Sequence, residues 1–253
     1  MLSDQHYRSQ IGQDKWVIED VFHEKRNGFF LDVGALDGVL LSNTYVLEKD
    51  YGWNGICIEA SSAFARLKMN RRCICENTCI ADTEKTVHFT EKGWDSGIST
   101  EASPASRPMR TETLAAVLER HAAPHVIDYC SIDIEGGEYD ALRVFPFHTY
   151  SFLCLTVEQK EREIREALQR LLTSNGYVLS LSPGIEDWYL HESIAQQVRY
   201  DGTVYAERFY RLWHSRWDEQ QKTAQLTRER NILADRLAKM IAIFKQSGLA
   251  DKV

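Results

Sequence analysis

Residues 29–38 read FFLDVGALDG, and this stretch decides the fold. Its first five residues are apolar apart from Asp32, which is typical of a buried strand, and it then enters a turn with glycine at positions 34 and 38. Glycine allows the backbone to adopt a positive φ and a ligand to approach closely. In open α/β sheets such strand-to-helix turns lie at the carboxyl edge, where ligands bind. We therefore predict a strand followed by a ligand-binding loop.

The rest of the chain alternates strand-like and helix-like segments. Short apolar runs bounded by polar or turn residues predict further strands at residues 55–59, 87–90, 129–134, 152–157 and 177–181. Helical spacing of apolar residues occurs between these runs, at residues 45–50, 62–70, 113–121, 139–144 and 161–175. Alternation of this kind is typical of a mostly parallel sheet with helices on both faces. The predicted class is a doubly wound α/β domain.

Two segments depart from the alternation. Residues 94–110 are rich in glycine, serine and proline, so we expect a long surface loop of the kind that often forms a lid. Residues 1–203 are predicted to form one domain, and residues 204–253 a long helical extension. Apolar residues recur in that extension at heptad spacing, namely Leu226, Leu233, Leu237, Met240 and Phe244. Three interpretations stay open: a helix packed on its own domain, a coiled coil that joins copies through residues 222–247, or a linker to another domain.

The composition limits the classes of function. The 253 residues include 30 basic and 37 acidic side chains, and the net charge of −7 argues against general nucleic-acid binding.

We see no apolar run long enough to span a membrane and no apolar signal region at the N-terminus, so a cytoplasmic location is expected. Cys73, Cys75 and Cys79 lack the paired spacing of structural zinc sites. No metal site is predicted there.

Acidic residues stand at the ends of two predicted strands and of one shorter apolar segment. Glu59 lies 21 residues beyond Gly38, close to the spacing at which an acid accepts the hydroxyls of a nucleoside ribose. Asp82 ends a shorter apolar edge and is suited to accept from an adenine amino group. Residues 128–138 read DYCSIDIEGGE, which gathers carboxylates beside two glycines. Like charges raise one another's pKa, and such clusters persist mostly at sites that bind cations or hydroxyl groups.

Three of these motifs resemble the FkbM family of methyltransferases: DVGA at residues 32–35, IEA at 58–60 and IDIEG at 132–136. SNTY at 42–45 and EDWY at 186–189 resemble one branch of that family. The resemblance covers about residues 28–190. It implies a class I methyltransferase (Rossmann-like) fold, S-adenosylmethionine as the methyl donor, and a hydroxyl of a sugar, glycan or polyketide as the acceptor.

The motifs and the resemblance together assign donor binding to the first loop and the next two strand ends. The predicted donor-binding residues are Asp32, Gly34, Ala35, Asp37, Gly38, Asn43, Glu59, Ala60 and Asp82. Leu36 stands where the family usually has asparagine, and Ala60 where it often has proline, so the contacts around these two positions stay open.

Methyl transfer to a hydroxyl requires a base close to the methyl group. By motif, Asp133 and Glu135 are the best-placed candidates, and Glu158 and His191 are the alternatives. The acidic set of Asp133, Glu135, Glu158 and Asp187 is also compatible with a divalent cation that orients a diol. Carboxylate geometry does not follow from a sequence, and we therefore predict no metal.

Two other classes of function compete with this interpretation. A nucleotide-dependent oxidoreductase would carry a G-x-G-x-x-G turn, which the chain lacks, and the pair Tyr45 and Lys49 follows the first loop too directly for a reductase dyad. The other competitor is an idle cofactor-binding module that oligomerises through its C-terminal helix. Joint retention of the glycine loop and of the strand-end acids argues against it.

Overall fold

The computed structural model describes residues 6–93, 96–99, 104, 106–198, 222, 226–227, 230 and 233–234. The chain divides into two compact units, Met1–Thr203 and Val204–Val253. In the second unit the described residues are helical, and Leu226 and Leu233 are 56% and 62% exposed. The other residues of the predicted heptad seam, Leu237, Met240 and Phe244, lie outside the described residues. The helical extension and its coiled coil therefore stay predictions.

A seven-stranded sheet forms the centre of the first unit, in the order β10-β11-β9-β8-β1-β2-β3. Its strands are β1 (Phe29–Val33), β2 (Asn54–Ile58), β3 (Ile74–Glu76), β8 (Val126–Ile132), β9 (Ser151–Glu158), β10 (Tyr177–Leu181) and β11 (Glu186–His191). Only β11 runs antiparallel to its neighbours; the other pairs are parallel. The predicted α/β class with a mostly parallel sheet is confirmed.

The strand order creates a topological switch point at β1. The chain leaves β1 toward β2 on one side and later returns to β8 on the other, so the connections diverge at the carboxyl end of β1. Open α/β sheets bind ligands at such switch points. The loop after β1 and the acidic turn after β8 therefore lie side by side.

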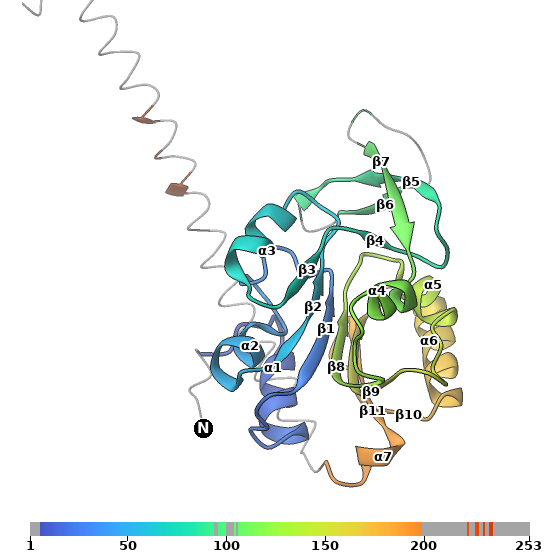
Figure 1. Cartoon of the computed structure of the whole chain (residues 1–253). Helices are drawn as coiled ribbons and strands as arrows, with labels where there is room; N and C mark the ends of the chain where they lie inside the picture. The colour runs from blue at the N-terminus through green and yellow to red at the C-terminus, as the bar shows by residue number, and fades with distance from the viewer. Residues whose placement is uncertain are drawn as a thin grey trace, which may run out of the picture. The chain divides into compact units, whose positions relative to one another are not determined.

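Helices cover both faces of this sheet (Figure 1). The helices α1 (Gln13–Lys15), α2 (Tyr45–Tyr51) and α3 (Phe64–Asn70) lie on one side, and α4 (Leu114–Arg120), α5 (Glu138–Arg143) and α6 (Arg162–Ser174) on the other. A π-helix (Trp16–Val21) continues α1, and α7 (Glu192–Ala195) follows β11. The core between α4–α6 and the sheet contains Leu31, Ile56, Leu118, Ile132 and Leu168.

Four further strands form a second, smaller sheet above the carboxyl edge of the first (Figure 1). They are β4 (Cys79–Ile80), β5 (Thr86–Thr90), β6 (Gly97–Ser99) and β7 (Ser106–Glu112). The prediction of a loop over residues 94–110 is wrong for the strand residues, because β6 and β7 both pair with β5. Met109 of β7 packs with Phe89 and Cys79 in a separate small core.

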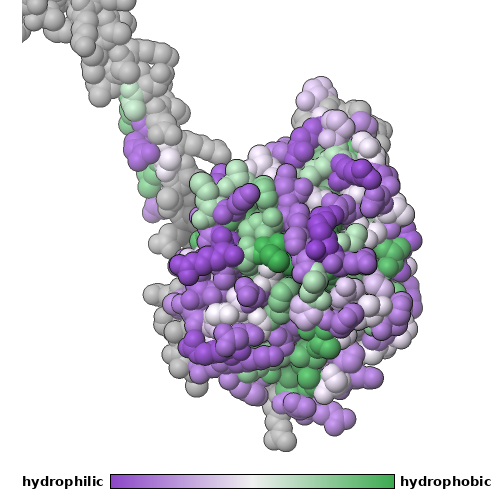
Figure 2. All heavy atoms as spheres, in the orientation of Figure 1, coloured by the Kyte–Doolittle hydropathy of each residue, from purple (hydrophilic) through white to green (hydrophobic). Residues whose placement is uncertain are grey.

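The face of the protein shown in Figure 2 is mostly hydrophilic, with small hydrophobic areas between the polar residues. Among the described residues, no helix combines the length and the apolar character that crossing a membrane requires.

Candidate functional site

The loop after β1, residues 34–44, is built around Gly34. Its φ is 90°, and a Cβ at this position would lie 1.7 Å from the carbonyl oxygen of Asp133. The amides of Gly34 and Ala35 both donate to the carbonyl oxygen of Ile58, at 2.9 and 3.1 Å. No residue with a side chain can occupy this position without moving the acidic turn. We call residues 34–44 the donor loop.

Glu59 at the end of β2 holds the donor loop in place. It is 5% exposed, and its carboxylate accepts from the backbone amides of Leu36 at 2.7 Å and Ser61 at 2.6 Å. A carboxylate has about four lone-pair positions, so each oxygen retains capacity for a further donor such as a hydroxyl. Glu59 therefore has a structural role toward the loop in addition to any role toward a ligand.

A pocket opens beside this contact, between the donor loop and the second sheet. It encloses about 580 Å³, part of which is open to solvent. Its lining residues are Leu36, Asp37, Leu40, Ser61, Ser62, Ala63, Arg66, Glu91, Gly93 and Ser96. Hydroxyl and charged groups thus surround a small apolar surface, which suits a polar ligand with an apolar face.

Three other predicted donor-binding residues lie in or beside the loop. Asp32 is 4% exposed and accepts from the Thr44 hydroxyl at 2.5 Å. Asp37 accepts from the amides of Val39 and Leu40 and so stabilises the turn at its own position. Asn43 donates its amide group to the Ser131 hydroxyl at 2.8 Å.

Asn43 also carries an unsatisfied atom. Its Oδ1 is buried and has no hydrogen-bond partner among the described residues. A buried acceptor without a donor costs free energy, and such atoms often mark where a ligand belongs. This oxygen suits an N–H or ammonium group of a bound molecule.

Ala60 and Asp82 are engaged elsewhere. The Ala60 carbonyl accepts from Arg107 at 2.6 Å, and its side chain packs on the small core of the second sheet. Asp82 forms ion pairs with Lys85 and Arg143, and the Lys85 hydrogen bond lowers its pKa. Neither is among the residues that line the pocket.

The second half of the site is the turn after β8. The carboxylates of Asp133, Glu135 and Glu158 each place one oxygen within 4.8 Å of the others. Two of these residues follow β8, and the third is the last residue of β9. Glu138, at the start of α5, accepts from the amides of Ile134 and Gly136, both at 3.0 Å. These bonds hold the turn closed. We call Asp133, Glu135 and Glu158 the acidic cluster.

Lys160 supplies a positive charge beside this cluster. The ammonium group of Lys160 lies 2.6 Å from the Glu135 carboxylate and 3.6 Å from that of Glu158. Burial opposes the charge of Lys160, but the Glu135 hydrogen bond and the neighbouring carboxylates raise its pKa to about 12. The Lys160 ammonium group therefore contacts two of the three acids.

The crowding of these carboxylates affects the pKa of Asp133. Burial raises the pKa of its carboxyl well above the usual range, and the charges of Glu158, Glu135 and Glu186 add to the effect. Close carboxyls that cannot all ionise retain a proton. The crowded carboxyls around Asp133 therefore increase its affinity for a proton.

Glu186 is a member of the site that the sequence analysis did not single out. It pairs with Glu158 across β11 and β9, is 6% exposed, and accepts from the Gln13 amide at 2.6 Å. Burial raises its pKa to about 7. Its signal in the sequence was the EDWY segment at residues 186–189, whose first residue begins β11.

Asp187 does not join the acidic cluster. Successive residues of a strand point to opposite faces, and Asp187 pairs with Val157 next to the Glu186–Glu158 pair. Its carboxylate is bound by Arg165 and by the Ser182 hydroxyl. Asp187 therefore cannot join the other three acids around one cation. The alternative of a divalent cation rests on Asp133, Glu135 and Glu158.

His191 lies at the wrong edge of the sheet to act as a base. Because β11 is antiparallel, Glu186 begins it beside Glu158, whereas His191 ends it beside Tyr177, the first residue of β10. The His191 ring accepts from the Ser193 amide at the start of α7. Its role is that of a helix cap.

No curated protein matches the chain. Among solved structures, methyltransferase FkbM from Methylobacillus flagellatus KT is 13% identical with a TM-score of 0.46, and the match covers 73% of this chain and 48% of that one. Human methyltransferase 10 domain containing protein is 13% identical with a TM-score of 0.42, and the match covers 72% of this chain and 80% of that one. Precorrin-6y C5,15-methyltransferase from Geobacter metallireducens GS-15 is 7% identical with a TM-score of 0.42, and the match covers 74% of this chain and 94% of that one.

These structural likenesses are too distant to carry an argument, and the chain spans about half the length of the Methylobacillus structure. The family comparison is more specific. Residues 32–179, more than half of the chain, match the methyltransferase FkbM domain, and the matched region contains the donor loop and the acidic cluster. The chain belongs to the FkbM methyltransferase family.

Proposed function

We propose that the protein moves a methyl group from S-adenosylmethionine to a hydroxyl of a sugar, glycan or polyketide-like acceptor. Family membership implies the donor, and the acceptor class is the proposal. The observation that carries it is the acidic cluster, whose three carboxylates lie within 4.8 Å of one another directly beside the donor loop.

The donor loop fits an adenosyl sulfonium. Gly34 leaves the crevice without a side chain, Glu59 has lone pairs for the ribose hydroxyls, and the unpaired Oδ1 of Asn43 suits the ammonium group of the methionine part. When bound, the donor supplies a methyl group on a good leaving group. The protein must then align the acceptor oxygen and remove its proton.

The acidic cluster suits that proton transfer. A carboxyl with a raised pKa is a stronger base once ionised, so Asp133 is the proposed base. With the donor bound, the Asp133 carboxylate would accept the proton of the acceptor hydroxyl as the oxygen attacks the methyl group. The methyl–sulfur bond would break in the same step, and S-adenosylhomocysteine would leave as a neutral thioether. Glu135 and Glu158 accept hydrogen bonds from neighbouring hydroxyls, and Lys160 limits the charge that accumulates. Hydroxyl-rich acceptors suit this cluster because an ionised carboxylate accepts hydrogen bonds and donates none.

Transfer of a labelled methyl group tests this proposal. The protein is incubated with labelled S-adenosylmethionine and a panel of sugars, glycans and polyketide alcohols, and products are separated by mass. We expect label on a hydroxyl oxygen of at least one class. Donor binding without transfer to any hydroxyl, but with transfer to an amine or a base, would refute O-methylation and retain the family assignment.

A further inference from the structure

Arg71, the residue that follows α3, is a buried cation that contacts the donor loop. The residue is 5% exposed, and its guanidinium lies 5.3 Å from the centre of the Phe30 ring. Arginine side chains are mostly exposed in folded proteins, and the sequence alone did not mark Arg71 as buried. The structure places the first arginine inside and leaves the second exposed.

All five N–H donors of Arg71 have acceptors within the protein. Nε donates to Glu48 at 2.7 Å. One terminal nitrogen donates to the carbonyl of Gly38 and the hydroxyl of Ser42, both at 3.2 Å, and the other to the carbonyl and hydroxyl of Thr44, at 3.3 and 3.0 Å. A guanidinium has five donors. Arg71 therefore has no donor left for a ligand and acts only through the residues that it holds.

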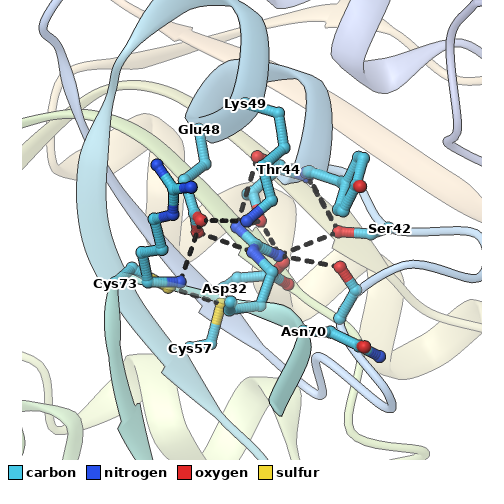
Figure 3. Close-up of polar contacts among 12 residues, drawn as sticks. Asp32, Ser42, Thr44, Glu48, Lys49, Cys57, Asn70 and Cys73 are labelled. Atoms are coloured by element: carbon cyan, nitrogen blue, oxygen red, sulfur yellow. Dashed lines mark hydrogen bonds and ion pairs between the residues drawn. The ribbon is translucent and has the colours of Figure 1, made fainter. Parts of the chain in front are cut away.

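The residues that it holds are those of the donor loop. Gly38, Ser42 and Thr44 span the half of the loop that carries Asn43, and the Thr44 hydroxyl continues the chain of bonds to Asp32 in β1. Figure 3 shows Ser42 and Thr44 of the loop close to Asp32 of β1 and to Glu48 of α2. The loop has little regular secondary structure of its own. One side chain thus replaces the backbone bonds that a helix or strand would supply.

The loop needs such support because its backbone is strained. Leu36 and Leu41 have φ of 48° and 55°, in the left-handed region that residues with side chains avoid. Conformations of this kind persist only when surrounding contacts enforce them. Without Arg71, we expect the loop to spend much of its time in relaxed conformations.

The ion pair of Arg71 is permanent across physiological pH. Burial opposes ionisation of Glu48, but the Lys49 hydrogen bond and the charge of Arg71 lower its pKa to about 2. The pair lies 2.7 Å apart with the Arg71 side chain fully buried. Its geometry is planar and directional, which an ammonium group does not reproduce.

We propose that Arg71 is a positioning residue that pre-forms the donor loop, so that S-adenosylmethionine binds without first ordering it. This inference rests on the proposed function only in taking the donor loop as the site of S-adenosylmethionine. The residue contacts no ligand. Its loss reduces donor affinity and leaves the chemical step of the bound complex unchanged.

The test compares Arg71→Lys and Arg71→Met with Arg72→Met, the matched control at the exposed neighbour. Hydrogen exchange of the amides of residues 38–45 is measured in the free protein, with those of α6 as the internal reference. We expect exchange in the loop to accelerate at least about tenfold in both Arg71 variants, since a pre-formed conformation becomes a minority one. Arg72→Met and the α6 amides should stay at the parent rate.

Calorimetry with S-adenosylmethionine gives the second readout. The dissociation constant should rise at least about tenfold in Arg71→Lys, because only the fraction of molecules with an ordered loop binds. The single-turnover rate at saturating donor should stay within about twofold of the parent value, as expected of a residue that does not act in the chemical step. Lower thermal stability with unchanged loop exchange and unchanged donor affinity would overturn the proposal.

A failure of the proposed function is distinguishable from a failure of this inference. A parent protein that does not bind S-adenosylmethionine refutes the proposed function, whereas the exchange measurement still decides whether Arg71 holds the loop. If neither Arg71 variant folds, Glu48→Gln retains the size of the partner and removes its charge. Loop exchange in that variant should lie between the parent rate and that of an open loop, and an unchanged rate overturns the proposal.

Discussion

The two halves of the site treat buried charge in opposite ways. On the donor side, Arg71 has an acceptor for each N–H, the Glu59 carboxylate accepts two backbone amides, and Asp32 accepts the Thr44 hydroxyl. On the acidic side, the three carboxylates of the cluster face one another, and Glu186 adds a fourth next to Glu158. Lys160 forms ion pairs with two of them, Glu135 and Glu158. The donor side is built to hold a shape, and the acidic side to hold a proton.

This difference has a physical reason. A satisfied network rigidifies a loop, which lowers the entropy lost when a ligand binds. Crowded carboxylates instead cost stability, and they persist mostly where the raised pKa is used. Substitutions on the donor side should therefore change affinity, whereas substitutions on the acidic side should change rate and pH dependence.

Asp133→Asn should have the largest effect. The amide keeps the size of the carboxyl but cannot accept a proton, so turnover should fall by about 10²–10⁴, the usual contribution of a general base. Donor affinity should change little, since the carboxyl is not among the groups that hold the donor loop. The measurement is the single-turnover rate, together with calorimetry. Turnover close to that of the parent would transfer the role of base to Glu135 or Glu158.

Glu186→Gln and Glu48→Gln should change the pH dependence of stability in opposite directions. The folded protein holds the Glu186 proton up to about pH 7, whereas the unfolded chain releases it near its ordinary pKa of 4.5. Its contribution therefore falls as pH rises from 4.5 to 7, by at most about 3 kcal/mol for a shift of this size. Glu186→Gln should remove that decline in a urea unfolding series.

Glu48 has the reverse sign. Its pKa is about 2 in the folded protein and 4.5 ordinarily, so its contribution is complete above pH 4.5 and is lost as pH falls toward 2. Glu48→Gln should flatten the acid limb by about the same amount and leave the interval from 4.5 to 7 unchanged. Parallel pH profiles for the two variants would refute the contrast between the two sides of the site.

Much of this contrast follows from strand-end residues alone. The carboxyl ends of parallel strands meet at one edge, so the ends of β1, β2, β8 and β9 could be assigned to one site from their sequence motifs. The sequence did not reveal β11, because the acids of EDWYLH conceal a buried strand. Because β11 is antiparallel, His191 lies at the opposite edge of the sheet from the site. Because successive side chains of a strand point to opposite faces, Glu186 faces the site and Asp187 does not. Direction and register are tertiary properties, and short motifs do not encode them.

The donor side shows the same limit. The glycine turn was predictable because a positive φ and a close approach both require glycine. Arg71 was not, because burial of an arginine depends on acceptors that arrive from a loop, a helix and a strand. In the small sheet, the strand predicted at residues 87–90 is β5, but β6 and β7 were missed, since they have little apolar content and form through pairing with β5.

Glu59→Gln tests the donor side with Asp82→Asn as its control. The amide keeps the size of Glu59 but loses the charge that strengthens hydrogen bonds from Leu36, Ser61 and a ribose, so donor binding should weaken by about 1–3 kcal/mol. Asp82 is paired with Lys85 and Arg143, and its amide variant should bind the donor as the parent does. A larger loss of affinity in Asp82→Asn than in Glu59→Gln would reverse the two assignments.

His191→Ala should have the smallest effect on activity. The residue lies five positions along β11 from Glu186, about 16 Å at the usual rise of a strand, which is too far for proton transfer at the acidic cluster. Its ring instead caps α7 by accepting from the Ser193 amide. Loss of such a cap costs about 0.5–2 kcal/mol of stability. Turnover and donor affinity should equal those of the parent at a temperature where both proteins are folded, while the urea midpoint falls slightly. A turnover loss comparable to that of Asp133→Asn would require His191 to reach the acidic cluster, and would contradict the strand direction that separates the two edges.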